Sequence, residues 1–128
     1  MKPRNELNLA ASRSLLVRKK RKNKYRAVRT VVNGISFHSK READYYRQLV
    51  LLGKAGKLRC FKRQVRFDLT DPRIPSVKES YVADFFVEFY GSLRDEVHEV
   101  KGFWTPEAKR KWKKVQALYP QYLYRVIR

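Results

Sequence analysis

Two neighbouring stretches decide the fold: YVADFFVEFY over residues 81–90 and EVHEVK over residues 96–101. Both are rich in aromatic and β-branched residues and a Gly-Ser turn lies between them, so we expect two paired strands. Side chains alternate between the two faces of a strand. Glu99 and Lys101 therefore share a face, and if it coincides with the face that carries Asp84, two carboxylates and a lysine converge within a small sheet.

This combination of side chains favours a metal-assisted site. Burying a charge without a partner costs free energy, whereas two acids that hold a divalent cation are compensated. Mg²⁺ takes oxygen ligands and keeps several waters, and we expect Mn²⁺ to substitute for it. Such an ion can generate a nucleophile from water at a phosphate, and a neighbouring lysine can orient that water or offset phosphate charge. We expect His98 and Glu88 to point away from this site, and Asp95 and Glu96 to be turn residues.

The composition points to nucleic acid as the partner. The chain has 128 residues, enough for one domain, and 31 Lys and Arg against 12 Asp and Glu give a formal net charge of +19. Such a balance favours nucleic acid first and an anionic membrane surface second. The single cysteine, Cys60, excludes an internal disulfide and a zinc site built on cysteines. No signal peptide or long apolar run is visible, so we expect a soluble intracellular protein without a membrane.

The N-terminal region divides into a tail and a hairpin. Residues 1–24 are predicted to be a flexible basic tail, either a nucleic-acid arm or a merely solvated segment, and residues 25–128 a single domain. Asn33-Gly34 is a strong hairpin signal within residues 25–37. The basic residues that we expect to contact nucleic acid lie in the tail, on the hairpin and on the outer face of a later helix: Arg18, Lys19, Lys20, Arg21, Lys22, Arg26, Arg29, Lys109 and Lys113.

A helix is predicted over residues 39–55. Ser39 is its candidate N-cap, and Glu42, three residues later, fits a capping box. Glu42 also lies three and seven positions before Tyr45 and Leu49, so it borders the apolar face of the helix. Two interpretations of Glu42 stay open: a residue that only caps the helix, or an additional carboxylate of the metal site.

The remaining elements complete an α/β domain. A strand is expected over residues 58–69 and a loop to residue 80. Thr105 and Pro106 begin a helix that ends near Tyr119, and residues 121–127 alternate as a final strand. We therefore predict a central mixed β-sheet flanked by helices, in which the second helix crosses over to a parallel last strand.

This arrangement resembles the PD-(D/E)XK nuclease superfamily, which has the restriction-endonuclease-like core. The resemblance rests on Asp84 in one strand, Glu99-Val100-Lys101 in the next and Glu42 on the preceding helix, and it covers about residues 37–128. One position departs from the family pattern, because the usual proline before the aspartate is Ala83. The chain looks most similar to small phage-encoded endonucleases and Holliday junction resolvases.

The resemblance implies a role for each matching residue. Asp84, Glu99 and the Val100 carbonyl would bind Mg²⁺, with Glu42 as an accessory ligand, and Lys101 would act on the attacking water or the scissile phosphate. The implied activity is hydrolysis of DNA phosphodiester bonds. By the same resemblance the protein would act in phage recombination or replication, in the cytoplasm of a bacterial host.

Recognition of DNA shape is expected, because no base-reading module is evident. The implied substrate is thus double-stranded or branched DNA such as a four-way junction, and cutting two strands would favour a homodimer. Two alternatives stay open. One is a non-catalytic, basic nucleic-acid-binding protein, and the other is a nuclease subunit that cuts only within a larger recombination complex.

Overall fold

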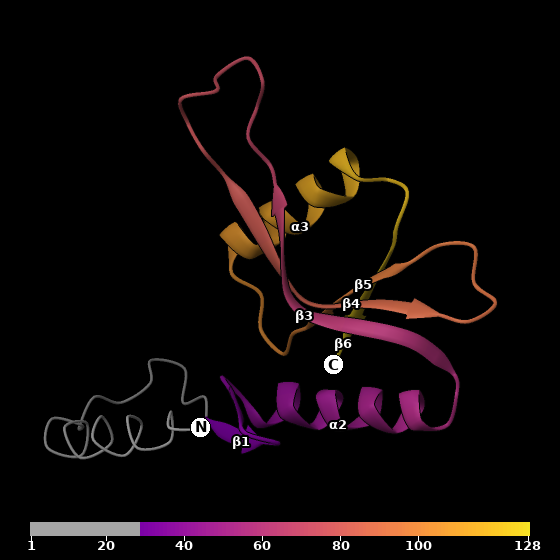
Figure 1. The fold of residues 1–128 in the computed structure, drawn as a ribbon. Coiled ribbons are helices and arrows are strands. Elements are labelled where there is room, and N and C mark those ends of the chain that lie inside the picture. Colours follow the sequence, from indigo (N-terminus) through magenta and orange to yellow (C-terminus); the bar gives the residue numbers. More distant parts are fainter. Residues whose placement is uncertain (1–28) are drawn as a thin grey trace, which may run out of the picture.

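A four-stranded sheet lies between two helices in the computed structural model, which describes residues 29–128 (Figure 1). The strands are β3 (Leu58–Asp68), β4 (Ser80–Phe89), β5 (Glu96–Val100) and β6 (Leu123–Ile127), and they lie side by side in this order. The β3–β4 and β4–β5 pairs are antiparallel, whereas β5 and β6 are parallel. The predicted mixed sheet and its parallel last strand are therefore confirmed.

A short hairpin precedes the first helix and forms a separate two-stranded sheet. It consists of β1 (Thr30–Val32) and β2 (Ile35–Phe37). Asn33 and Gly34 form its turn with φ values of 53° and 78°. Asparagine and glycine tolerate this left-handed conformation better than other residues, which explains why the pair marked the hairpin in the sequence. The first residues of the predicted hairpin and the whole basic tail lie outside the described residues.

Helix α2 (Lys40–Lys54) covers one face of the sheet. Ser39 is its N-cap, and the Ser39 side chain accepts a hydrogen bond of 3.2 Å from the Glu42 amide. This bond satisfies one of the amides that a helix leaves unpaired at its start. The helix begins and ends within about one residue of the predicted range.

Helix α3 (Pro106–Leu118) covers the opposite face and connects β5 to β6 (Figure 1). Thr105 caps its start by accepting a 3.0 Å hydrogen bond from the Ala108 amide, and Pro106 occupies the first turn, where its missing N–H costs nothing. Among residues 29–128 no helix is long and apolar enough to cross a membrane.

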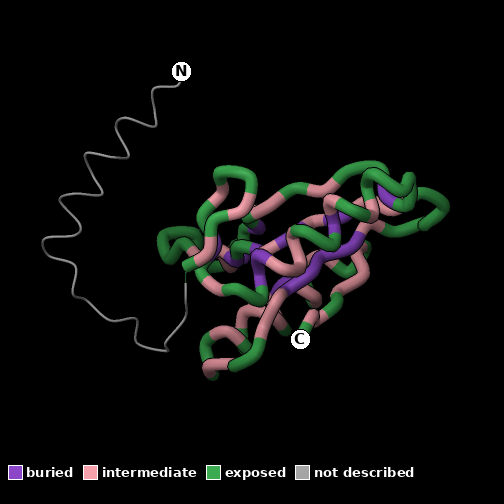
Figure 2. The backbone as a smooth tube through the Cα atoms, turned by 90° about the horizontal axis from the view of Figure 1, so that it is seen from below, coloured by how far each residue is buried: buried purple, intermediate pink, exposed green. Residues whose placement is uncertain are grey.

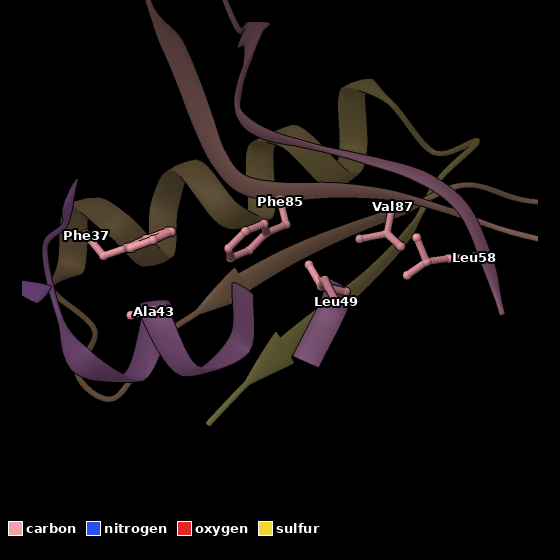
Figure 3. Close-up of a cluster of buried hydrophobic side chains, with 6 residues drawn as sticks. All are labelled: Phe37, Ala43, Leu49, Leu58, Phe85 and Val87. Carbon is pink, nitrogen blue, oxygen red and sulfur yellow. The ribbon is translucent and has the colours of Figure 1, made fainter. Parts of the chain in front are cut away.

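Two buried clusters hold the three layers together, and the buried parts of the chain run through the centre of the molecule (Figure 2). One cluster packs between α2, the hairpin and the sheet (Figure 3); it contains Phe37, Ala43, Leu49, Leu58, Phe85 and Val87. The other packs beneath α3; it contains Phe67, Leu69, Tyr81, Ala83, Val97 and Val115.

The β3–β4 ribbon changes the face that it buries halfway along its length. Ala83 belongs to the cluster beneath α3, whereas Phe85 belongs to the cluster beneath α2. Residues two apart would share a face in a regular strand, so the ribbon must turn between them. The turn falls at Gln64 in the neighbouring strand, whose φ is 53°, and both strands bend sharply in Figure 1. The bend places Asp84 where both layers meet.

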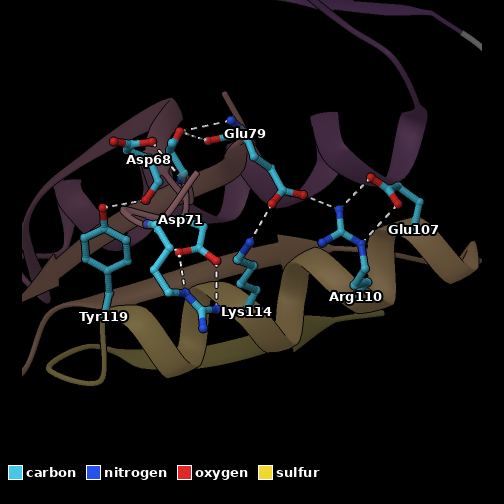
Figure 4. A network of polar contacts seen from close by, with 9 residues as sticks. Asp68, Asp71, Glu79, Glu107, Arg110, Lys114 and Tyr119 are labelled. Carbon is cyan, nitrogen blue, oxygen red and sulfur yellow. Dashed lines mark hydrogen bonds and ion pairs between the residues drawn. The ribbon is translucent and has the colours of Figure 1, made fainter. Parts of the chain in front are cut away.

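Ion pairs fasten the β3–β4 loop to α3 (Figure 4). Glu79 accepts hydrogen bonds from Arg110 and, at 2.7 Å, from Lys114. The Tyr119 hydroxyl, directly after the helix, donates to the Asp68 carbonyl at 2.9 Å. These contacts hold the far end of the ribbon against α3 and the residue that follows it.

Candidate active site

Four predicted side chains come together at the bend, and each comes from a different place in the chain. Asp84 lies in β4, Glu99 in β5, Lys101 directly after β5, and Glu42 in the first turn of α2. Hydrogen bonds and an ion pair hold these side chains in place, and at this short range the charge of Asp84 raises the pKa of both Glu42 and Glu99. The charge of Lys101 lowers the pKa of all three carboxylates.

Asp84 is oriented by the backbone of the neighbouring strand. Its Oδ2 atom accepts a hydrogen bond of 2.9 Å from the Val100 amide. Burial raises the pKa of Asp84, while this hydrogen bond and the charge of Lys101 lower it. The bond fixes the carboxylate beside the Glu99-Val100-Lys101 segment.

Glu99 is buried, with 6% of its surface exposed, and both of its oxygens are held. Oε1 accepts a hydrogen bond from the Tyr81 hydroxyl, and Oε2 lies 3.5 Å from Nζ of Lys101. Burial and the charge of Asp84 raise the pKa of Glu99. Burial also raises the pKa of Tyr81 far above its ordinary value, so its hydroxyl stays protonated and acts as the donor.

Glu42 takes part in the helix cap through its backbone and points its side chain away from the cap. Its amide donates to the N-cap Ser39, while its carboxylate turns toward the sheet and accepts a 3.4 Å hydrogen bond from Nε2 of Gln64. Burial, followed by the charge of Asp84, raises the pKa of Glu42 to about 7, although Arg63 and Lys101 oppose the shift. A residue that only capped the helix would not need this environment.

Gln64 holds the bend and contacts two carboxylates. It lies between the β3–β4 pairs Arg63↔Phe85 and Val65↔Ala83, which places it opposite Asp84. Its side chain donates to Glu42, and its hydrogen bond to Asp84 lowers the pKa of that residue. A left-handed conformation costs a non-glycine residue about 1–2 kcal/mol. Backbone strain of this kind is often found at functional sites. Because Gln64 also bonds two of the carboxylates, we assign it to the candidate site.

Asp84 and Glu99 are the two carboxylates that could hold a hard divalent cation. In the described residues no group of three or more histidine, cysteine, aspartate or glutamate side chains is arranged so that it could hold a metal ion. Mg²⁺, however, is commonly bound by one or two carboxylates and completes its coordination with waters. Asp84 and Glu99 offer such a pair, and their mutual repulsion would be relieved by a cation between them.

The other basic residues predicted to contact nucleic acid are partly described. Arg29 lies beside the hairpin, where Nη1 donates to Oγ of Ser36 at 3.2 Å, and Lys109 and Lys113 are exposed on α3. The remaining predicted contacts lie outside the described residues: Arg18, Lys19, Lys20, Arg21, Lys22 and Arg26.

The expectation for His98 is consistent with its contacts, whereas that for Glu96 is wrong. The buried His98 ring lies 2.6 Å through Nδ1 from the Tyr45 hydroxyl and 2.8 Å through Nε2 from Oε1 of Glu96. Glu96 is not a turn residue: it begins β5, is 6% exposed and also accepts a 2.7 Å bond from Arg125. Burial of the ionised Glu96 carboxylate is tolerated because Arg125 donates to it and its contact with the His98 ring also lowers its pKa.

Tyr81 is the site residue that the sequence did not reveal. Strict alternation places Tyr81 and Asp84 on opposite faces of β4, so the pattern gave no reason to join them. They reach the same site because the ribbon turns between Ala83 and Phe85. The position of the left-handed residue that causes this turn has no mark in the sequence, because glutamine is not a residue favoured there.

The fold and the site define an α/β domain with a cluster of carboxylates and a lysine at a bend in its sheet. The chain belongs to a family of proteins of unknown function, DUF1064, whose profile matches residues 22–128. No curated protein and no solved structure matches the chain.

Proposed function

We propose that the chain is a metal-dependent endonuclease that hydrolyses DNA phosphodiester bonds. The observation that carries this proposal is the meeting of Asp84, Glu99 and Lys101 at one bend of the sheet, with Glu42 held beside them by Gln64. Acids are scarce in a chain of charge +19, so three partly buried carboxylates beside one lysine call for a function. The same residues carry the resemblance to the PD-(D/E)XK nucleases, and a restriction-endonuclease-like core is part of the proposal.

Each residue has a part in this chemistry. Asp84, Glu99 and the Val100 carbonyl would hold Mg²⁺ or Mn²⁺, and Glu42 would add an oxygen directly or through water. The chemistry supplied by the bound cation is acidification of water and neutralisation of charge on the reacting phosphate. Lys101 lies beside Glu99, where its ammonium can orient the attacking water or bind a phosphate oxygen. The Tyr81 hydroxyl fixes Glu99 from the other side.

The proposed substrate is DNA with a branched structure. The net charge supports binding to a phosphate backbone, which supplies most of the non-specific affinity of nucleic-acid-binding proteins. A homodimer would present two sites to the two strands of a junction. We propose phage recombination in the bacterial cytoplasm as the setting, on the resemblance alone.

The test compares a radiolabelled four-way junction with the matching linear duplex. Each is incubated with the full chain under Mg²⁺, under Mn²⁺ and in EDTA, and with the Asp84→Asn variant. We expect metal-dependent cutting of the junction that is lost in the variant while binding persists. Cutting of both DNAs would remove the preference for junctions. Tight binding without cutting under either metal would overturn the proposal that the chain alone is an enzyme. It would favour a nucleic-acid-binding protein or a nuclease subunit that needs a partner.

A further inference from the structure

A second feature adjoins the candidate site: an open depression of about 310 Å³ between β4 and the start of α3. Glu99 and Lys101 form part of its wall, so it is continuous with the carboxylate site. The rest of the wall that matters here is aromatic and basic, and comes from Tyr81, Trp104 and Lys111. Its volume lies near the lower end of ligand sites, which span about 300–1,000 Å³.

Trp104 forms one side of the depression, and its position is fixed. The ring is half-buried and lies 5.8 Å from the ring of Trp112, which in turn packs against Tyr81 at 6.0 Å. Nζ of Lys101 lies 5.6 Å from the centre of the Trp104 ring. An aromatic face held next to a cation is the arrangement on which single-stranded nucleic acids stack their bases.

Lys111 supplies a second charge at the same depression. It is half-buried on α3 and forms no ion pair within residues 29–128, unlike Arg110 and Lys114, which both bind Glu79. Its charge is therefore available to a phosphate. The depression thus combines a stacking surface, a cation for a flanking phosphate and the reacting residues of the proposed site.

We propose that this depression binds one unpaired nucleotide next to the scissile phosphate, with its base stacked on Trp104 and a flanking phosphate at Lys111. A base within a duplex is covered on both faces and cannot stack on a protein side chain until it leaves the helix. The pocket would therefore select DNA that offers an unpaired nucleotide at the cut, as bulges and flaps do and as a junction does when a base pair at its branch point opens. This inference rests on the proposed nuclease function and states how its substrate is chosen.

The test measures binding in EDTA, where the proposed nuclease would not cut, so the result is independent of catalysis. The full chain is titrated onto a duplex that carries one unpaired 2-aminopurine and onto the same duplex fully paired, and anisotropy gives both affinities. Stacking of one base predicts about tenfold tighter binding to the unpaired form. The fluorescence of 2-aminopurine should also fall as the base stacks on Trp104.

Four variants and one conservative replacement decide the outcome. Trp104→Ala should lose the tenfold preference, Lys111→Ala should reduce it, and Trp104→Tyr should keep it. Tyr90→Ala and Lys54→Ala remove an exposed aromatic and an exposed lysine from elsewhere on the surface, and should keep it too. Thermal melting of each variant checks that it is folded.

Equal affinity of the wild type for both duplexes, or a preference that survives Trp104→Ala, would overturn the inference. Failure of the proposed function looks different. If binding depends on Trp104 but the chain cuts no DNA under Mg²⁺, the proposal of the nucleotide pocket stands and the proposal of nuclease activity falls. If the chain cuts DNA with and without unpaired nucleotides at the same rate, the proposal of nuclease activity stands and the proposal of the nucleotide pocket falls.

Discussion

Nζ of Lys101 lies 3.5 Å from Oε2 of Glu99, two residues along the chain and on the same side of the sheet. The lysine is half-buried, with 29% of its side chain exposed, so its charge faces both the carboxylate and the solvent. Without a bound cation, the Lys101 ammonium neutralises the negative charge of Glu99. When a cation neutralises Glu99 instead, the ammonium can bind a phosphate oxygen of the substrate.

The first prediction concerns the chemical role of Lys101. Lys101→Ala should lower the cleavage rate by about 10²–10⁴-fold, the range that positioned proton-transfer groups contribute, while Mn²⁺ binding persists. Single-turnover rates and Mn²⁺ titrations measure the two effects separately. Lys54→Ala, at the exposed end of α2, is the matched control. A variant that cuts within a few-fold of the wild-type rate would remove Lys101 from the reaction.

A second prediction separates the backbone strain at Gln64 from its side-chain contacts. Gln64→Gly relieves the left-handed conformation and should be more stable than Gln64→Ala by about 1 kcal/mol. Both variants lose the amide that donates to Glu42, so both should cut DNA more slowly than the wild type. Urea unfolding and cleavage rates give the two quantities. A glycine variant less stable than the alanine variant would show that the bend at Gln64 is not strained.

The buried bond between Tyr45 and His98 provides a third prediction. Tyr45→Phe removes the hydroxyl 2.6 Å from Nδ1 and leaves a buried ring nitrogen without a partner. The free energy of unfolding should fall by about 1–3 kcal/mol, the cost of an unsatisfied buried polar group. Tyr90→Phe removes an exposed hydroxyl and should change little. Equal unfolding midpoints for the two variants would mean that the Tyr45 bond adds nothing.

Acid should weaken the contact between Glu79 and α3. Hydrogen bonds from Arg110 and Lys114 lower the pKa of Glu79 from 4.5 to about 2. Because the pKa is lower in the folded state, the stabilisation is complete above pH 4.5 and is lost as the pH falls toward 2. Glu79→Gln should therefore lower the melting temperature at neutral pH, and the difference should shrink below pH 4.5. A difference that stays constant with pH would show that the Glu79 charge is not involved.

The local elements could be read from the sequence because each is set by nearby residues. The Asn33-Gly34 turn, the Ser39 cap and the Thr105-Pro106 helix start all satisfy local backbone demands, and all lie where they were expected. The neighbouring positions of Asp84 and Glu99 could be predicted for the same reason. The alternation of side chains along the two strands and the turn between the strands suffice to bring both acids to one face.

The bend in β3 and β4 could not be read from the sequence. It depends on Gln64, which has a left-handed conformation, and on two hydrophobic clusters that bury opposite faces of the ribbon on either side of the bend. Tyr81 reaches Glu99 only through that bend, so its place in the site could not be predicted either. Glu96 was misplaced because its partner Arg125 lies 29 residues away in β6, a contact that only the parallel pairing creates.

The most direct test of the central claim is whether Asp84 holds a divalent cation. Mn²⁺ binding is measured by electron paramagnetic resonance for the wild type, Asp84→Asn and Glu88→Gln. Glu88 is the matched control because it lies on the same strand but pairs with Arg59 outside the site. We predict wild-type binding in the control and binding weaker by roughly 10- to 100-fold or more in Asp84→Asn, at least the loss seen when an outer partner of a metal ligand is removed. Equal binding by all three proteins, or none by the wild type, would contradict the account.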